Sequence, residues 1–456
     1  MSTAIIDENQ INGLLNEAGN ATKEEINAIV EKAKECNGLS LGEAAKLLQI
    51  EDQSLLENLF EAARWIKHKI YGKRIVIFTP LYSSSACSNN CLYCGFRAAN
   101  KEMERKTLNL EEIRQETRAI EKEGHKRILL VCGEDRKNTD IDHITGAVKA
   151  IYEAGDIRRI NVNAAPMSVA DFKKLKRAGI GTYQIFQETY HRESYKKMHP
   201  TGLKADYDYR LTAVERALEA GIDDYGIGVL LGLYDYRFDV LATLMHAEYM
   251  EKQYGIGPHT ISIPRLRPAP GAAIEKAPNP VSDQDFKKIT AIYRLAVPYT
   301  GIILSTRESE EVRNDVLNLG VSQISAGSKT SPGGHDKKNA KASQFETSDE
   351  RSLDQMLTVI CKQGHLPSFC TACYRTNRTG KAFMDLVKDI DINDLCQLNA
   401  LLTFKENLMD FASEETVDTG EIIIRESLEE MADPGARAKI EAALLAIEKG
   451  QRDLFR

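Results

Sequence analysis

The sequence has no run of eighteen apolar residues, the length that a helix needs to cross a membrane. Its beginning, Met1 to Glu8, lacks the basic stretch and following apolar run of a secretory signal. Basic residues do not outnumber acidic ones, and the net charge of −7 disfavours nucleic acid as the main partner, because phosphates bind to a basic face. From these absences we expect a protein of the cytoplasm that binds neither membrane nor nucleic acid.

Cysteine, in contrast, occurs nine times, and six of these residues fall into two tight groups. In a reducing cytoplasm they are not expected to form disulfides, and an odd count rules out complete pairing. The grouping therefore favours ligation of a metal or an iron–sulfur cluster. We assign no metal role to Cys36, Cys132 and Cys361, which lie outside the groups, because a free cysteine packs as a small apolar side chain.

Strand-like and helix-like segments alternate over most of the chain. Before them, residues 1–72 predict a helical N-terminal extension, since Thr22–Glu25 and Ser40–Glu43 match the capping-box pattern. Amphipathic segments such as Leu110–Glu123 and Ser282–Ala296 separate apolar, β-branched runs. These runs predict eight strands: Arg74–Tyr82, Lys126–Glu134, Arg158–Ala165, Thr182–Thr189, Asp224–Leu233, Thr260–Leu266, Gly301–Glu308 and Val321–Gly327.

Eight such units predict an α/β fold with a complete (β/α)8 TIM barrel over residues 73–330. The rival is a doubly wound open sheet, which rarely repeats the unit eight times. Ser328–Ser343 is rich in Lys, Gly, Ser and Asn and predicts a mobile loop after the last strand. Residues 331–456 predict a helical C-terminal domain that carries the second cysteine group.

Polar residues gather where the predicted strands end, and active sites of such barrels lie at the carboxyl ends of the strands. One such residue is ordinary in a loop, but six polar strand ends predict a functional mouth, because buried polar groups need partners. The residues are Glu134 and Asp135, Asn161 and Asn163, Gln187 and Glu188, His259, Arg265 and Arg267, and Ser305, Thr306 and Arg307.

The first cysteine group, Cys87, Cys91 and Cys94, follows the first predicted strand. Four cysteines would saturate a [4Fe–4S] cluster, whereas three leave one iron open for a substrate or cofactor. A structural zinc site that lacks its fourth ligand is the alternative. The tight spacing directly after a barrel strand favours the cluster.

This C-x3-C-x2-C segment, with Tyr93 before the last cysteine, resembles the cluster motif of the radical S-adenosylmethionine (SAM) superfamily. The resemblance implies that the open iron binds SAM, whose cleavage yields a 5′-deoxyadenosyl radical. Cys132-Gly133-Glu134 resembles the family's Gly-Gly-Glu element, with Cys in place of the first Gly, and implies that Glu134 holds the methionine amine. Glu188 resembles the ribose-binding position and Arg210 the residue that pairs with the methionine carboxylate; surface ion pairs are the alternative for both.

The second cysteine group consists of Cys370 and Cys373, followed after twenty-two residues by Cys396. A C-x2-C pair alone is ambiguous between zinc, redox and cluster roles. The third cysteine favours a second cluster with an open iron, and a zinc knuckle with His365 as fourth ligand is the alternative.

A C-x2-C-x22-C segment after such a barrel resembles the tyrosine lyases of [FeFe]-hydrogenase maturation, the HydG family, over nearly the whole chain. Supporting stretches are Arg74–Tyr82, Gly181–His191, Gly257–Arg267 and Pro298–Arg307. The related thiazole-pathway tyrosine lyases (2-iminoacetate synthases) share the barrel but lack these cysteines. The resemblance implies that tyrosine is split into p-cresol and dehydroglycine, which becomes CO and cyanide on an extra iron at the second cluster, for H-cluster assembly.

The same resemblance implies a role for His259 as ligand of the extra iron, and an ordinary loop histidine is the alternative. Its expected place near the end of the sixth strand, beside Arg265 and Arg267, favours the ligand. Arg307 is a candidate for binding the tyrosine carboxylate, and Asn161, Asn163, Gln187 and Ser305 are candidates for its amine and ring. A purely structural role inside the barrel is equally compatible with these residue types.

Two further classes of function stay open at this point. One is a lyase of the thiazole type that stops at dehydroglycine, against which the C-terminal cysteines argue. The other is a non-catalytic iron–sulfur or zinc protein, against which the polar barrel mouth argues. The family resemblance implies a flavodoxin or ferredoxin-type electron donor and other hydrogenase maturation proteins as partners.

Overall fold

The computed structural model describes residues 5–336, 343–376, 378–382 and 392–455. Residues 337–342 of the predicted mobile loop therefore lie outside the described residues. None of the described helices is both long enough and apolar enough to cross a membrane. The domain boundaries expected at residues 72 and 330 stay predictions.

Eight parallel strands close into a barrel, because the first strand pairs with both the second and the eighth. The strands are β1 (Arg74–Ser84), β2 (Arg127–Cys132), β3 (Arg159–Asn163), β4 (Tyr183–Gln184), β5 (Tyr225–Gly228), β6 (Thr260–Ser262), β7 (Gly301–Leu304) and β8 (Gln323–Ser325). The predicted (β/α)8 barrel is confirmed. Most strands are shorter than predicted, because their polar carboxyl ends leave the ladder and form loops.

Helices surround the barrel and also precede it in the chain. Side-chain caps begin several of them, and both predicted capping boxes are present, with Thr22 and Ser40 as the N-caps. The N-terminal helices are α1 (Glu8–Ala18), α2 (Lys23–Ala33), α3 (Leu41–Leu48) and α4 (Gln53–Tyr71). The barrel helices are α5 (Leu110–Lys122), α6 (Ile141–Ala154), α7 (Val169–Arg177), α8 (Arg192–Met198), α9 (Tyr207–Leu211), α10 (Ala213–Glu219), α11 (Tyr236–Tyr254), α12 (Asp283–Ala296) and α13 (Glu310–Leu317).

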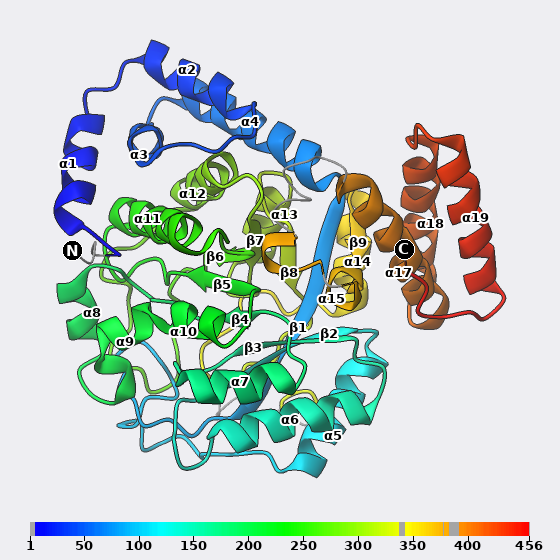
Figure 1. The fold of residues 1–456 in the computed structure, drawn as a ribbon, viewed down its shortest axis with the longest axis horizontal. Coiled ribbons are helices and arrows are strands. Elements are labelled where there is room, and N and C mark those ends of the chain that lie inside the picture. Colours follow the sequence, from blue (N-terminus) through cyan, green and yellow to red (C-terminus); the bar gives the residue numbers. More distant parts are fainter. Residues whose placement is uncertain (1–4, 337–342, 377, 383–391, 456) are drawn as a thin grey trace.

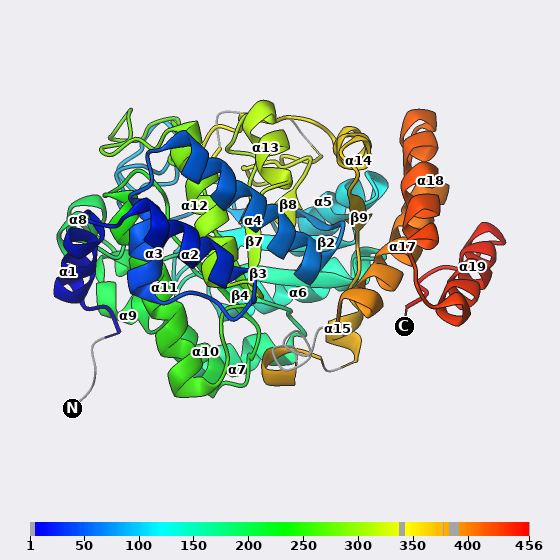
Figure 2. The ribbon, with the colours of Figure 1, turned by 90° about the horizontal axis from the view of Figure 1, so that it is seen from above.

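The C-terminal region is mostly helical but adds one strand to the barrel sheet. Figures 1 and 2 show α18 and α19 at the opposite side of the molecule from α1. Its elements are α14 (Leu353–Lys362), β9 (Leu366–Ser368), α15 (Ala372–Arg375), α17 (Ile392–Asp410), α18 (Glu414–Glu429) and α19 (Pro434–Glu448).

The long strand β1 connects the two ends of the barrel. Its first residues, Arg74 to Val76, pair with β9, and its later residues, from Thr79 on, pair with β2. At about 3.3 Å per residue, β1 spans roughly 33 Å from Arg74 to Ser84. A side chain near Arg74 and a loop after Ser84 therefore belong to opposite mouths of the barrel.

Candidate functional site

The first cysteine group lies in the loop that leaves β1 at the carboxyl end of the barrel. The N–H and the Oγ of Ser88 both donate to the carbonyl oxygen of Glu134, each at 2.9 Å. The loop approaches the end of β2 so closely that a Cβ atom on Gly133 would lie 2.1 Å from the carbonyl oxygen of Ala86. Only glycine fits at that position, so Gly133 acts by letting the cysteine loop dock.

The thiols of Cys87, Cys91 and Cys94 line one cavity. Burial raises the pKa of the Cys87 thiol to about 11 and also raises the pKa of Cys91 and Cys94. A thiolate at these positions therefore needs an adjacent cation. In the part of the chain that the structure describes, no three His, Cys, Asp or Glu side chains converge as ligands of one ion would. Each cysteine of a [4Fe–4S] cluster binds a different iron, so this donor set fits a cluster with one open iron.

Glu134 and Arg210 form a buried pair beside the cysteine loop. Glu134 accepts from Asn89 Nδ2 at 2.6 Å and from Arg210 Nη1 at 2.7 Å. The side chains of Arg210 and Glu134 are only 5% and 12% exposed, which excludes a surface ion pair. Burial opposes ionisation of Glu134, but Arg210 and Lys204 outweigh it and hold the pKa of this carboxyl below its ordinary value. Glu134 thus presents a carboxylate that can accept from a ligand ammonium group.

Glu188 reaches the same cavity from the loop after β4. Its backbone lies in the left-handed region, with φ at 71°, which is uncommon for a residue with a Cβ atom. Lys204 Nζ donates to Glu188 Oε1 at 2.5 Å, and the Lys204 N–H donates to Asn89 Oδ1. Strained backbone of this kind clusters at ligand sites. The sequence did not single out Lys204, because a lysine in a short polar turn carries no recognisable signal.

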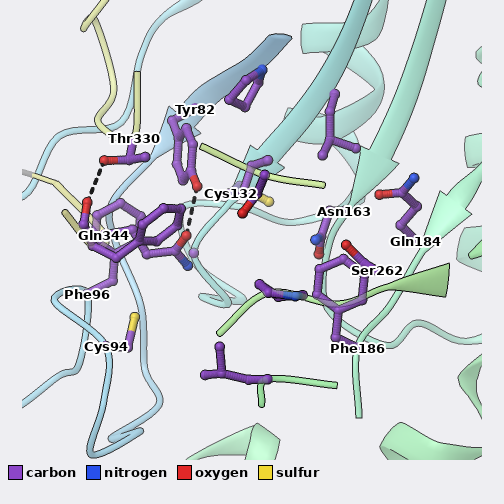
Figure 3. A pocket seen from close by; sticks show the side chains of 18 of the residues that line it. Tyr82, Cys94, Phe96, Cys132, Asn163, Gln184, Phe186, Ser262, Thr330 and Gln344 are labelled. Atoms are coloured by element: carbon purple, nitrogen blue, oxygen red, sulfur yellow. Dashed lines mark hydrogen bonds between the residues drawn. The ribbon is translucent and has the colours of Figure 1, made fainter. Parts of the chain in front are cut away.

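The cavity occupies about 1330 Å³, its open mouth included. Figure 3 shows Tyr82, Gln344, Asn163 and Cys132 among its side chains, and Tyr82 Oη donates to Gln344 Oε1 at 2.8 Å. Sequence patterns missed Tyr82 and Gln344, because one lies inside a strand and the other follows the long loop.

Three of the predicted tyrosine-contacting residues, Asn163, Ser305 and Arg307, line this cavity. The Arg307 guanidinium carbon lies 3.4 Å from the centre of the Phe345 ring. Burial lowers the pKa of Arg307, and within the described ranges its guanidinium has no hydrogen-bond or ion-pair partner. A half-buried cation of this kind that lines a cavity is suited to bind an anionic group.

The structure does not bring Asn161 and Gln187 to this cavity. Gln187 follows Phe186 and precedes Glu188, which both line the cavity, so its side chain points to the other face and donates to the carbonyl oxygen of Tyr207 at 3.3 Å. Asn161 Oδ1 accepts from the N–H of Thr182 at 3.0 Å. Both side chains stabilise the barrel locally, which corrects their expected place in a tyrosine pocket.

The second cysteine group lies at the other, amino end of the barrel. Leu366 of β9 pairs with Arg74 at the start of β1, and Cys370 comes two residues after β9. Arg127, the first residue of β2, donates from Nη1 to the carbonyl oxygen of Cys370 at 2.8 Å. The two groups are therefore separated by the length of the barrel.

Cys373 and Cys396 form a hydrogen-bonded pair between α15 and α17. The hydrogen bond from Cys373 lowers the pKa of Cys396 against the effect of burial, and the charge of Arg74 adds to this shift. Burial raises the pKa of the Cys370 thiol, and the nearby charge of Cys396 adds to this shift. The charge of Arg127 opposes it. The donor set, three thiols among arginines, fits a second anionic cluster.

His365, the fourth ligand of the alternative zinc site, lies away from these cysteines. The three residues of β9, which span roughly 10 Å, and Phe369 separate it from Cys370. Its Nε2 lies 2.7 Å from Asn318 Oδ1. The structure therefore does not support a zinc knuckle that includes His365.

His259 lies at the amino end of the barrel, immediately before β6 begins at Thr260. This corrects the expectation that it stands beside Arg265 and Arg267. Those two arginines follow the opposite end of β6, where both donate to Glu308. The predicted strand also began at Thr260, so the error lay in assigning a residue that precedes this strand to the carboxyl mouth. The histidine lies at the end that carries the second cysteine group.

Comparisons with known proteins agree with this architecture. Residues 81–245 match the family described as the radical SAM superfamily, and residues 262–366 match the biotin and thiamin synthesis associated domain. The 2-iminoacetate synthase of Escherichia coli (strain K12) is 32% identical over 341 residues, which cover 75% of this chain and 89% of that protein.

Two solved structures match over almost all of the chain. One is HydG, a maturase of the [FeFe]-hydrogenase, with a TM-score of 0.97, 50% identity and complete coverage of both chains. The other is HydG from Carboxydothermus hydrogenoformans, with a TM-score of 0.86, 42% identity and coverage of 96% of this chain and 97% of that chain. The chain belongs to the radical SAM superfamily, in the family that includes the 2-iminoacetate synthases and HydG.

Proposed function

We propose that the chain is a radical SAM tyrosine lyase that makes the CO and cyanide ligands of the [FeFe]-hydrogenase H-cluster. At the carboxyl end, the Cα–Cβ bond of tyrosine breaks and yields p-cresol and dehydroglycine. At the amino end, dehydroglycine is converted to CO and cyanide on a bound iron. The relatives support both stages, since one is a 2-iminoacetate synthase and another is an [FeFe]-hydrogenase maturase.

One observation carries this proposal: two cysteine groups lie at opposite ends of one barrel, one in the loop after β1 beside Glu134 and the other beside Arg127 at the start of β2. A lyase that stops at dehydroglycine needs only the group at Cys87–Cys94. The match to 2-iminoacetate synthase covers 75% of the chain, whereas the match to HydG covers all of it, the second group included.

At the carboxyl end, the chain's own residues bind and orient. Cys87, Cys91 and Cys94 would hold a [4Fe–4S] cluster, and Tyr93, Gly133, Glu134, Glu188 and Arg210 would surround SAM. When bound, these cofactors supply a deoxyadenosyl radical that takes a hydrogen atom from tyrosine. Glu134 accepts from the methionine ammonium group. Arg210, already bonded to Glu134, pairs with the methionine carboxylate.

Arg307 is the proposed anchor for the substrate tyrosine. It is a half-buried cation that lines the cavity, and a carboxylate would balance its charge. Ser305 and Asn163 line the same cavity and can accept from the substrate ammonium group. Phe345 lies flat against the guanidinium and restricts its direction. The result is one fixed orientation of the amino acid beside the radical source.

At the amino end, Cys370, Cys373 and Cys396 would hold an auxiliary [4Fe–4S] cluster, and His259 would bind the additional iron. Neutral imidazole and thiolate are both good ligands for iron. The iron at this end is cargo, because it leaves with the CO and cyanide for the hydrogenase. A flavodoxin or ferredoxin-type electron donor, other hydrogenase maturation proteins and a location in the cytoplasm complete the proposal.

An anaerobic assay with tyrosine, SAM and a reductant tests the proposal when p-cresol and CO are measured together. We expect both products from protein whose two clusters have been reconstituted. p-Cresol without CO, at full cluster content, would favour a lyase of the thiazole type. Deoxyadenosine without either product would contradict tyrosine as the substrate.

A further inference from the structure

A row of polar side chains runs along the amino end of the barrel, from the second cysteine group to His259. It begins at Tyr374, the residue after Cys373. Tyr374 Oη lies 3.1 Å from Thr182 Oγ1, and Thr182 Oγ1 donates to Asp224 Oδ2 at 3.2 Å. The other carboxylate oxygen of Asp224, Oδ1, lies 3.4 Å from His259 Nδ1.

The barrel frame fixes three members of this row. Thr182, Asp224 and His259 stand immediately before the neighbouring strands β4, β5 and β6. The N–H of Thr182 donates to Asn161 Oδ1 at 3.0 Å, and the N–H of Tyr183 donates to the carbonyl oxygen of Asp224 at 3.0 Å. Because adjacent strands lie roughly 5 Å apart, their first side chains meet without any movement of the backbone.

The fourth member, Tyr374, is held from the other side. The guanidinium carbon of Arg159, the first residue of β3, lies 3.7 Å from the centre of the Tyr374 ring. The phenol therefore has a fixed place between the strand starts and the loop that carries Cys370 and Cys373. A substitution at Tyr374 would therefore alter contacts both beside Cys373 and in the polar row that leads to His259.

Asp224 Oδ1 is the atom in this row that can accept a hydrogen bond from His259. Asp224 is 4% exposed, and Oδ1 has no well-aligned hydrogen bond among the described residues. A buried carboxylate oxygen without a donor is costly. His259 Nδ1 is placed to supply that donor after a small rotation of the ring. A histidine that binds a metal through one nitrogen commonly donates its other N–H to a carboxylate.

We infer that Asp224 is a positioning residue for His259. Its carboxylate accepts from Nδ1–H, which leaves Nε2 as the nitrogen whose lone pair can bind iron. Thr182 and Tyr374 connect the same carboxylate to the loop of Cys373, so the histidine and the cysteines are aimed at one site. This inference rests on the proposed function, because it takes His259 as a ligand of the additional iron.

The test is the affinity of the cluster-loaded protein for Fe(II), measured without oxygen by competition with a chelator. In Asp224→Asn we expect binding about 10- to 100-fold weaker, since loss of such a supporting carboxylate has that effect at metal sites. CO should fall with the bound iron, while p-cresol stays within about twofold, because the tyrosine end is untouched. The exposed Asp142→Asn is the matched control and should keep the wild-type affinity.

Tyr374→Phe is the second variant, because it removes a single hydroxyl group and keeps the ring that packs on Arg159. Loss of one hydrogen bond predicts iron affinity about two- to tenfold weaker. Wild-type affinity in both Asp224→Asn and Tyr374→Phe would overturn the inference.

His259→Ala separates this inference from the proposed function. If His259→Ala binds Fe(II) as tightly as the wild type, the iron ligand of the proposed function is wrong and the role of Asp224 is wrong with it. If His259→Ala loses the iron while Asp224→Asn keeps it, only the role of Asp224 is wrong.

Discussion

The two ends of the barrel carry cysteine groups that are built in different ways. At the carboxyl end, Cys87, Cys91 and Cys94 come from one short loop, and Ser88 holds this loop to the Glu134 carbonyl through its N–H and its hydroxyl. At the amino end, the cysteines come from three places: the loop after β9, the helix α15 and the helix α17. The first site is thus fixed by local chain geometry, whereas the second depends on how the C-terminal elements pack against the barrel.

The amino end of such a barrel is ordinarily a face that serves stability. Here a polar residue begins or directly precedes each of five neighbouring strands, and several of these residues contact the segment of Cys370 to Tyr374. They are Arg127, Arg159, Thr182, Asp224 and His259. Under the proposed function, the difference teaches that one barrel can hold two reaction sites when C-terminal elements cover the end that usually serves stability.

The largest effect is expected from removal of a ligand at the carboxyl end. Cys91→Ala leaves the first cluster without one of its three thiolates, so p-cresol, CO and deoxyadenosine should all fall below detection in the anaerobic assay. Cys36→Ala, in the N-terminal region, is the control and should keep all three products. Deoxyadenosine formed by Cys91→Ala would contradict the assignment of the first group.

Arg307→Met should lower kcat/KM for tyrosine by about 10- to 100-fold, because a hydrogen bond to a charged group contributes about 1.5–3 kcal/mol. p-Cresol and CO should fall together, so that their ratio stays at the wild-type value. The exposed Arg192→Gln should change neither product. A loss of CO without a matching loss of p-cresol in Arg307→Met would contradict the assignment of Arg307 to the tyrosine end.

Gly133→Ala tests the docking of the first cysteine loop. The added Cβ atom would lie 2.1 Å from the carbonyl oxygen of Ala86, so the loop must shift at a cost of about 1–3 kcal/mol. We expect a lower iron content at the first site, measured in a Cys370→Ala background that lacks the second cluster. The iron content of the second site, measured in a Cys91→Ala background, should be unchanged. Gly13→Ala, with no atom within 4 Å of the new Cβ, should leave both contents unchanged.

The smallest effect is expected at the aromatic support of Arg307. Phe345→Leu removes a cation–π contact that contributes about 0.5–1 kcal/mol, so KM for tyrosine should rise about two- to fivefold. Phe455→Leu removes the ring beneath Arg375 in the C-terminal region and should leave KM unchanged. An unchanged KM in Phe345→Leu would show that Arg307 needs no such support.

The sequence was most informative where function depends on local patterns. Strand and helix periodicity predicted the barrel, and the cysteine spacings predicted both groups. Glu134 was predicted as well, because it follows a strand in a recognisable tripeptide. Each of these signals lies within a few residues, so no knowledge of distant contacts was needed.

The missed features all depend on contacts between distant parts of the chain. The carboxyl end of β6 at Ser262 is set by pairing with β5 and β7 and not by the apolar run, which predicted a strand up to Leu266. Phe345 reaches Arg307 from beyond the loop that follows β8. Asp224 and Thr182 were missed because they contact each other only where the neighbouring strands β4 and β5 begin side by side.

The central claim is that the two ends perform separate stages, and Cys370→Ala tests it most directly. In the anaerobic assay with tyrosine, SAM and reductant, the account predicts p-cresol within about twofold of the wild type, because the sites are too far apart to couple directly. CO should be absent. CO at the wild-type rate from Cys370→Ala, with its first cluster intact, would contradict the account.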